Sequence, residues 1–211
     1  EARLGVGMQG LAQAEIAYQN AADFARDRLQ SRALSGPAAP EKPADPIIVH
    51  PDVRRMLMDS RAFTEGARAF MFWTALYGDL LHKSPDDAVR QKAGDYMALM
   101  TPVVKAFLTD IGFKTTSECL QLHGGIGYTQ EMGVEQYMRD ARIAMIYEGT
   151  NGIQALDLVG RKLAANGGRA IFTFFKEMDD FVGENADNGD MKLFTDALSD
   201  AKKKLEAGTT W

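Results

Sequence analysis

The sequence predicts an all-α protein, an antiparallel bundle of long helices, from three observations. Apolar and small residues recur at helical spacing along most of the 211 residues, and no run of alternating β-branched residues suggests a strand. The helical segments are long and separated by few loops, which is typical of antiparallel bundles. We expect the bundle over residues 1–165 and a helical C-terminal extension over residues 166–211.

The first helix and the loop after it differ sharply in composition. Residues 3–32 show apolar side chains three or four positions apart, which predicts one long helix. Residues 34–48 hold four of the seven prolines. Because proline removes a backbone donor and disfavours the helical conformation of the residue before it, we expect an extended surface loop there. Such a loop is either a solvated connector or a functional segment.

Two more long helices are predicted on either side of a capping motif. The second helix begins near Pro51, since proline suits the first turn of a helix, and it runs to about His82. Ser84 is expected to cap the third helix, with Pro85 in its first position and two acids facing the positive end of the helix dipole. The third helix reaches about Leu122.

Shorter helices are predicted to complete the chain. They cover about residues 134–138, 152–165, 169–183 and 190–207. Gly167 and Gly168 interrupt the helical pattern, and a polar stretch over residues 183–189 has the composition of a turn. The tail therefore predicts two helices joined by a tight connection.

Composition excludes several classes of protein. Hydrophobic residues make up 45% and charged residues 25%, as in ordinary globular proteins, and no stretch approaches the ~18 apolar residues of a membrane span. The net charge of −5 comes without a clustered basic surplus, so no nucleic-acid partner is expected. The single cysteine favours a reducing compartment, and we expect a cytoplasmic location. The histidines have no metal-ligand spacing with Cys119, so no metal site is predicted.

The first glycine-rich interruption reads QLHGGIGYT over residues 121–129. Its three glycines permit positive φ and close backbone approach to a ligand, and exposed N–H groups there could receive a phosphate. It is neither a Gly-Lys-Ser/Thr phosphate loop nor a Rossmann fingerprint, because it lacks the lysine, a third spaced glycine and a preceding strand. The alternative is a helix C-cap followed by a turn, since Gly124 follows a periodic helix.

The second interruption reads IYEGTNGIQ over residues 146–154. Glu148 stands beside an aromatic residue and a glycine in an apolar run. If it were buried and unpaired its pKa would be raised, which suits a general base. The alternative is an acidic residue near the start of the helix that begins at about Asn151.

Three motifs together resemble the C-terminal helical domain of FAD-dependent acyl-CoA dehydrogenases. They are QLHGGIG at 121–127, YMRDAR at 137–142 and IYEGTNGIQ at 146–154, in the order and spacing of that family. The resemblance covers roughly residues 3–165 and implies a four-helix-type bundle. The proline loop and the tail resemble the bacterial longer-chain subclass that includes 3-methylmercaptopropionyl-CoA dehydrogenases.

The resemblance implies roles in the α,β-desaturation of acyl-CoA thioesters. Glu148 matches the catalytic base, which removes the α-proton while the β-hydrogen passes as hydride to FAD. The backbone N–H of Glu148 would help to polarise the thioester carbonyl. Gly149 lets the chain pass close to the substrate, and Arg3 matches a residue that contacts the CoA moiety. Substrate-binding roles are therefore expected for Arg3 and Gly149.

The resemblance also implies a set of FAD contacts. The matching positions are Arg28, His50, Gln121, Gly124, Gly125, Thr150 and Gly152. Arg28 matches the arginine at the FAD diphosphate, and Gln121 with the two following glycines matches a loop at the FAD of a neighbouring subunit. Two departures affect this set. Pro51 replaces the glutamine that follows His50 in relatives, and Ser31 stands where a flavin-stacking Phe is usual.

Partners follow from the same resemblance. It implies an acyl-CoA substrate, electron-transfer flavoprotein as the electron acceptor, and a homo-oligomer, dimer or tetramer, packed through the helical domain. The family's enzymes carry two further domains before this region, so we expect a domain fragment that is inactive alone. A catalytically silent assembly domain and a relative of the acyl-CoA oxidases remain alternatives.

Overall fold

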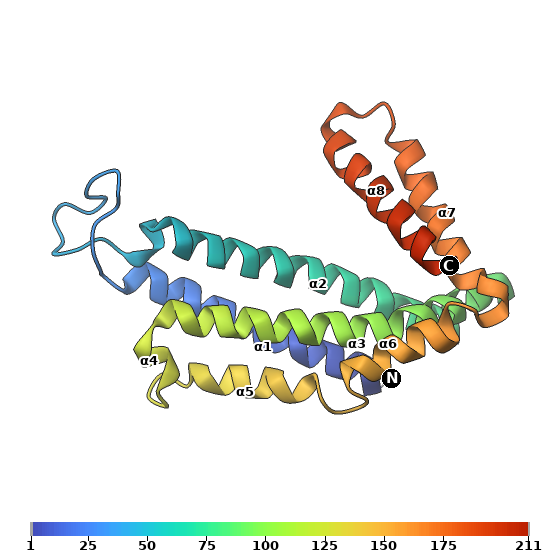
Figure 1. Ribbon diagram of the computed structural model, residues 1–211, viewed down its shortest axis with the longest axis horizontal. Helices are drawn as coiled ribbons and strands as arrows, with labels where there is room; N and C mark the ends of the chain where they lie inside the picture. Colours follow the sequence, from blue (N-terminus) through green and yellow to red (C-terminus); the bar gives the residue numbers. More distant parts are fainter. Residues whose placement is uncertain (1, 211) are drawn as a thin grey trace. The chain divides into compact units, whose positions relative to one another are not determined.

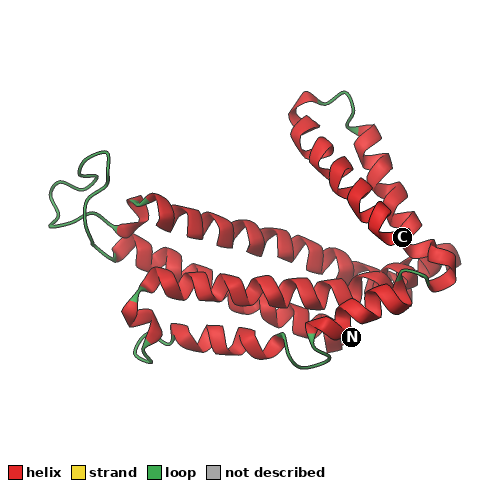
Figure 2. Cartoon of the chain, in the orientation of Figure 1, coloured by secondary structure: helices red, strands yellow, loops and turns green. Residues whose placement is uncertain are grey.

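The computed structural model describes residues 2–210, and that part of the chain is helical almost throughout (Figures 1 and 2). No β-strand occurs in it, only an isolated antiparallel bridge between Leu29 and Pro46. The predicted all-α class is confirmed. No helix within these residues combines the length and the apolar character needed to cross a bilayer.

Seven of the eight helices within residues 2–210 agree in order with the helices predicted from the sequence, and the short helix Gly125–Tyr128, within the expected turn, was not predicted. In chain order the helices are α1 (Ala2–Asp27), α2 (Pro51–Lys83), α3 (Asp87–His123), α4 (Gly125–Tyr128), α5 (Val134–Ala144), α6 (Asn151–Asp157), α7 (Arg169–Glu184) and α8 (Lys192–Thr209). A π-helical turn follows α6 at Leu158–Lys162. The segment predicted over residues 134–138 is longer than expected, because α5 continues to Ala144.

The chain divides into two compact units. The first contains the chain up to Leu76 and from Met100 to Ala155, and the second contains Tyr77–Leu99 and the chain from Leu156 onward. The sequence predicted a different division, a domain that ends at residue 165 followed by an extension. That division stays a prediction.

Glycine and alanine bring α1 and α3 together in the first unit. A Cβ atom on Gly10 would lie 2.5 Å from the Leu108 carbonyl oxygen, and one on Gly112 would lie 2.6 Å from the Gly10 carbonyl oxygen. The two backbones therefore touch where larger side chains cannot fit. Four alanines of α1 are also fully buried; they are Ala14, Ala17, Ala21 and Ala25. The core of this unit thus depends on small residues as much as on large ones.

The predicted extension of the first helix to residue 32 is wrong, because α1 ends at Asp27. The next residues pair instead with a segment that is distant in sequence. The Gln30 N–H donates to the Asp45 carbonyl oxygen (2.9 Å), and the Asp45 N–H donates to that of Ser31 (2.9 Å). Ser31 adopts a left-handed φ of 59°. These non-local hydrogen bonds replace those that a longer helix would make.

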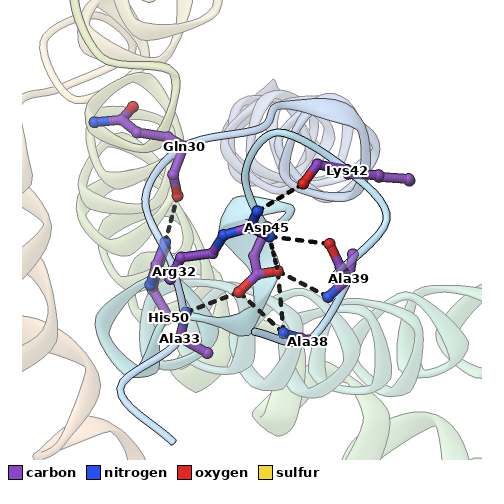
Figure 3. A network of polar contacts seen from close by, with 8 residues as sticks. All are labelled: Gln30, Arg32, Ala33, Ala38, Ala39, Lys42, Asp45 and His50. Carbon is purple, nitrogen blue, oxygen red and sulfur yellow. Dashed lines mark hydrogen bonds and ion pairs between the residues drawn. The ribbon is translucent and has the colours of Figure 1, made fainter. Parts of the chain in front are cut away.

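The proline-rich loop is wound around one buried carboxylate rather than extended (Figure 3). Asp45 accepts hydrogen bonds from the backbone N–H groups of Ala33 (2.9 Å), Ala38 (3.0 Å) and Ala39 (2.8 Å), and from the Arg32 guanidinium (3.1 Å). The Ala33 amide, with the other amides and Arg32, holds the pKa of Asp45 well below its usual range, although burial acts in the opposite direction.

The start of α3 also corrects the capping prediction. The cap is Asp86 rather than Ser84, because the Asp86 carboxylate accepts from the Ala88 N–H (2.8 Å). The Ser84 hydroxyl accepts from the Asp86 N–H at 3.2 Å, which closes a turn before the helix. Pro85 accordingly lies in that turn and not in the first helical position.

The second unit contains a helical hairpin at its C-terminal end, in which α7 and α8 run antiparallel (Figure 1). Lys202 on α8 forms an ion pair with Asp179 on α7 (3.0 Å). Arg169, at the start of α7, makes a two-pronged ion pair with Asp95 on α3 (2.6 and 2.8 Å). The interruption predicted at Gly167 and Gly168 is confirmed, since both have positive φ.

Candidate functional site

Glu148 lies in the turn between α5 and α6, in a conformation that is unusual for its residue type. Its φ is 55° and that of the following Gly149 is 85°. Left-handed backbone is open to glycine but costs a residue with a side chain on the order of 1 kcal/mol or more. The surrounding structure must therefore hold Glu148 in place.

The carboxylate and the backbone N–H of Glu148 are available to another molecule. The side chain is exposed, and neither its carboxylate nor its backbone N–H bonds to any residue that the structure describes. A carboxylate can accept a proton, and an N–H beside it can donate to a carbonyl oxygen. The burial assumed for a general base is not provided by this chain itself. Exclusion of water would have to come from what binds over the turn.

Gln154, for which the sequence predicted no role, holds the turn through hydrogen bonds to its backbone. The side chain is 2% exposed. Its amide nitrogen donates to the carbonyl oxygens of Gly149 (3.0 Å) and Glu148 (3.3 Å), and its amide oxygen accepts from Arg3 (3.0 Å). The two left-handed residues are thus held by their own carbonyl groups. The sequence carries no signal for this role, because a glutamine on a helix looks the same whether it is buried or faces water.

Other predicted or neighbouring residues also form hydrogen bonds at the turn. Arg3, predicted to contact CoA, here donates to Gln154. The Tyr147 hydroxyl donates to the side-chain oxygen of Gln9 on α1. The Thr150 carbonyl oxygen accepts from the N–H groups of Ile153 (2.8 Å) and Gln154 (3.1 Å), so α6 begins directly after it.

A second group of predicted residues lies where α1 ends. Arg28 is exposed, and its guanidinium bonds to none of the described residues. The His50 ring nitrogen Nε2 is within hydrogen-bond distance of the Gln30 carbonyl oxygen (2.9 Å), so that contact already occupies it (Figure 3). The ring of His123 lies against Phe24 of α1, with centroids 4.5 Å apart. This packing places the end of α3 beside the end of α1.

The glycine loop after α3 is open at this same end. Gly124 has a φ of 67°, and a Cβ atom on Gly124 or Gly125 would meet no atom within 4 Å. Gln121 is exposed and lines a groove of about 480 Å³ together with Tyr128 and Arg139. The expected turn after the helix is present as well, since the Gly124 N–H donates to the Gln121 carbonyl oxygen (3.0 Å).

The predicted site residues therefore form two groups at opposite ends of α1 (Figure 1). Arg3, Glu148, Gly149, Thr150 and Gly152 lie near its first residues, and Arg28, His50, Gln121, Gly124 and Gly125 lie near its last. The helix has 26 residues, which at a rise of 1.5 Å each gives a length of about 39 Å. Within the described part of the chain, no three metal-ligating side chains converge.

Comparison with known proteins gives one consistent family. The family model described as acyl-CoA dehydrogenase, C-terminal domain, matches residues 1–163. The chain is 44% identical over 208 residues to 3-methylmercaptopropionyl-CoA dehydrogenase of Ruegeria pomeroyi, covering 98% of this chain and 35% of that protein. It is 36% identical over 218 residues to the broad-specificity linear acyl-CoA dehydrogenase FadE5 of Mycobacterium tuberculosis, covering 99% and 35%.

A solved structure gives the same fold. The crystal structure of Caenorhabditis elegans ACDH-11 in complex with C11-CoA superposes with a TM-score of 0.82 at 20% identity, covering 97% of this chain and 32% of that one. The chain spans about a third of the length of each of these relatives. The similarity at this identity concerns the fold.

Proposed function

The chain belongs to the acyl-CoA dehydrogenase family, within which it matches the C-terminal domain, and from this we propose that it carries the catalytic base of an acyl-CoA dehydrogenase. The proposed reaction removes one hydrogen from each of the α- and β-carbons of an acyl thioester and forms the double bond between them. The observation that carries the proposal is the free carboxylate of Glu148, displayed on a turn that Gln154 holds rigid.

Glu148 acts in this proposal as the acceptor of the α-proton. The thioester carbonyl acidifies the α-carbon, and the carboxylate oxygen takes the proton from it. The backbone N–H of Glu148 is free to donate to the same carbonyl oxygen and to stabilise the negative charge that develops there. Since Glu148 is exposed in the chain itself, the bound substrate and cofactor have to exclude water from it.

The second group of residues suits the FAD that the family implies. The guanidinium of Arg28, which has no partner among residues 2–210, can bind a diphosphate, and the open backbone at Gly124 and Gly125 allows close approach of a ligand. Gln121, on the rim of its groove, presents an amide beside them. Bound FAD supplies the acceptor for the β-hydrogen, which leaves as a hydride. The electrons then pass to an external acceptor, for which we propose electron-transfer flavoprotein.

The separation of the two groups favours a homo-oligomer, a dimer or tetramer. Glu148 and Arg28 lie about the length of α1 apart, and one extended dinucleotide is too short to reach both in a single chain. A second copy can bring its Arg28 end to the Glu148 end of the first. Light scattering of the complete protein tests this point, and a monomer at high concentration would contradict it.

Turnover of the full-length protein tests the proposed function. Wild type should reduce an electron-accepting dye with an acyl-CoA, and Glu148→Gln should lower kcat by about 10²–10⁴-fold while flavin content stays the same. Glu184→Gln, an exposed acid at the end of α7, is the matched control and should leave kcat unchanged. Equal turnover of wild type and Glu148→Gln would remove the base assignment. A flavin-free, inactive wild type would favour an assembly domain.

A further inference from the structure

We propose that Lys105 is a positioning residue for Glu148, and that it acts through Asn151 at the start of α6. The inference rests on the proposed function for its effect on the reaction. Its structural part, that Lys105 orders the turn, is independent of that function.

Lys105 is a fully buried lysine with little in its surroundings to compensate for its burial. The side chain lies on α3 and is 0% exposed. Burial lowers the pKa of its ammonium group, and nearby Asp110 acts in the opposite direction. Among the described residues its only hydrogen-bond acceptor is the Asn151 side-chain oxygen, at 2.7 Å. One hydrogen-bond acceptor does not offset the desolvation cost of a buried ammonium group, so stability alone does not account for a lysine here.

Asn151 is held by three side chains of α3 at once. Its oxygen accepts from Lys105, and its amide nitrogen donates to the Thr109 hydroxyl (2.9 Å) and to the Asp110 carboxylate (2.6 Å). Lysine can only donate and a carboxylate can only accept. The amide therefore cannot turn over without placing donor against donor and acceptor against acceptor. Lys105 and Asp110 together thus fix the orientation of the Asn151 side chain.

This anchor controls the turn that bears Glu148. Asn151 is the first residue of α6 and follows Glu148 by three positions. One turn later Gln154 binds the carbonyl oxygens of Glu148 and Gly149. If the start of α6 shifts against α3, Gln154 shifts with it, and so does the backbone of Glu148. A displacement of about 1 Å can lower a reaction rate by about 10²-fold.

The rate and the stability should consequently respond in different directions. Lys105→Met keeps the volume and removes the buried charge, so the melting temperature should be unchanged or higher. In the full-length flavoprotein kcat should fall by about 10–100-fold, with KM for acyl-CoA and flavin content unchanged. Thr116→Val is the control, since Thr116 is buried on the same helix and donates only to the Phe113 carbonyl oxygen.

Two further measurements separate positioning from other effects. Because Lys105 acts through Asn151, Lys105→Met combined with Asn151→Ala should lower kcat no further than Asn151→Ala alone. In the 211-residue chain, Lys105→Met should speed hydrogen exchange of the Ile153 and Gln154 amides at least tenfold, because both donate to Thr150 at the start of α6.

The outcomes distinguish this inference from the proposed function. Wild-type exchange rates and wild-type kcat in Lys105→Met would overturn the positioning role, as would additive losses in the double variant. A clearly lower melting temperature of Lys105→Met would also overturn the positioning role, because it would show that Lys105 is merely structural. If the wild-type protein does not oxidise acyl-CoA, the proposed function fails, and the exchange measurement still decides whether Lys105 orders the turn.

Discussion

At the scale of single residues, the candidate site depends on a backbone conformation that only a supported turn can maintain. Glu148 and Gly149 are both left-handed, and Gln154 binds both of their carbonyl oxygens. The sequence motif predicted Glu148 as the catalytic base through resemblance. Neither its positive φ nor the buried contacts of Gln154 and Lys105 could be predicted, because a buried polar residue on a helix looks in sequence like one that faces water.

Replacement of Gly149 tests how tightly this turn is packed. In Gly149→Ala the new Cβ atom would lie 2.8 Å from the Gln154 amide nitrogen, at a φ that alanine disfavours. We expect a loss of about 1–3 kcal/mol in the free energy of unfolding, measured by urea titration.

Gly152→Ala is the control for stability, since a Cβ there would meet only the Thr150 hydroxyl at 4.0 Å. It should be neutral or up to about 1 kcal/mol stabilising, because alanine is the better helix former. Equal effects of the two replacements would contradict the tight turn.

At the scale of elements, periodicity predicted the long helices well and the end of α1 poorly. The helices α2, α3, α7 and α8 follow patterns that local sequence carries in full. The end of α1 does not, since it is decided by pairing with residues about fifteen positions further along the chain. The compact form of the proline-rich loop was missed for the same reason. It depends on three amides and an arginine that reach Asp45 only in the folded chain.

The contact between α1 and α3 should tolerate no added methyl group. Gly10→Ala places a Cβ atom 2.5 Å from the Leu108 carbonyl oxygen, so the helices have to separate. We expect the free energy of unfolding, measured by thermal unfolding, to fall by about 1–3 kcal/mol, as for other overpacked cores.

Gly66→Ala on the exposed side of α2 is the matched control, with no atom within 4 Å of its new Cβ. It should stabilise the chain by about 0.5–1 kcal/mol. Stability unchanged in Gly10→Ala would show that the helices are not in backbone contact.

The loop around Asp45 should make the chain sensitive to acid. The folded-state pKa of Asp45 lies below that of an unfolded aspartate, about 3.9, so the folded state binds fewer protons. Its contribution to stability is complete above that pH and is lost as the pH falls toward the folded-state pKa. Urea unfolding at a series of pH values from about 5 down to about 2.5 should therefore show that the free energy of unfolding falls more steeply in wild type than in Asp45→Asn.

Asp187→Asn, an exposed aspartate in the turn after α7, should keep the wild-type slope. Parallel curves for wild type and Asp45→Asn would show that the carboxylate is not held in its charged form.

At the scale of the whole molecule, the fold class and the family were both readable from sequence, for different reasons. Helical periodicity alone gave the class, whereas the family required three motifs in a fixed order. The placement of the first and third motifs at opposite ends of α1 required the structure. That separation is the reason for expecting that a complete site needs more than one copy of the chain.

A single-turnover measurement tests the central claim that Glu148 is the base most directly. Full-length wild type and Glu148→Gln, each with bound flavin, are mixed without oxygen with the same acyl-CoA, and the flavin absorbance is followed. We predict that the flavin of the wild type is bleached, while that of Glu148→Gln stays oxidised at least about 10²-fold longer although the variant still binds the thioester. Bleaching at the same rate in both proteins would contradict the claim.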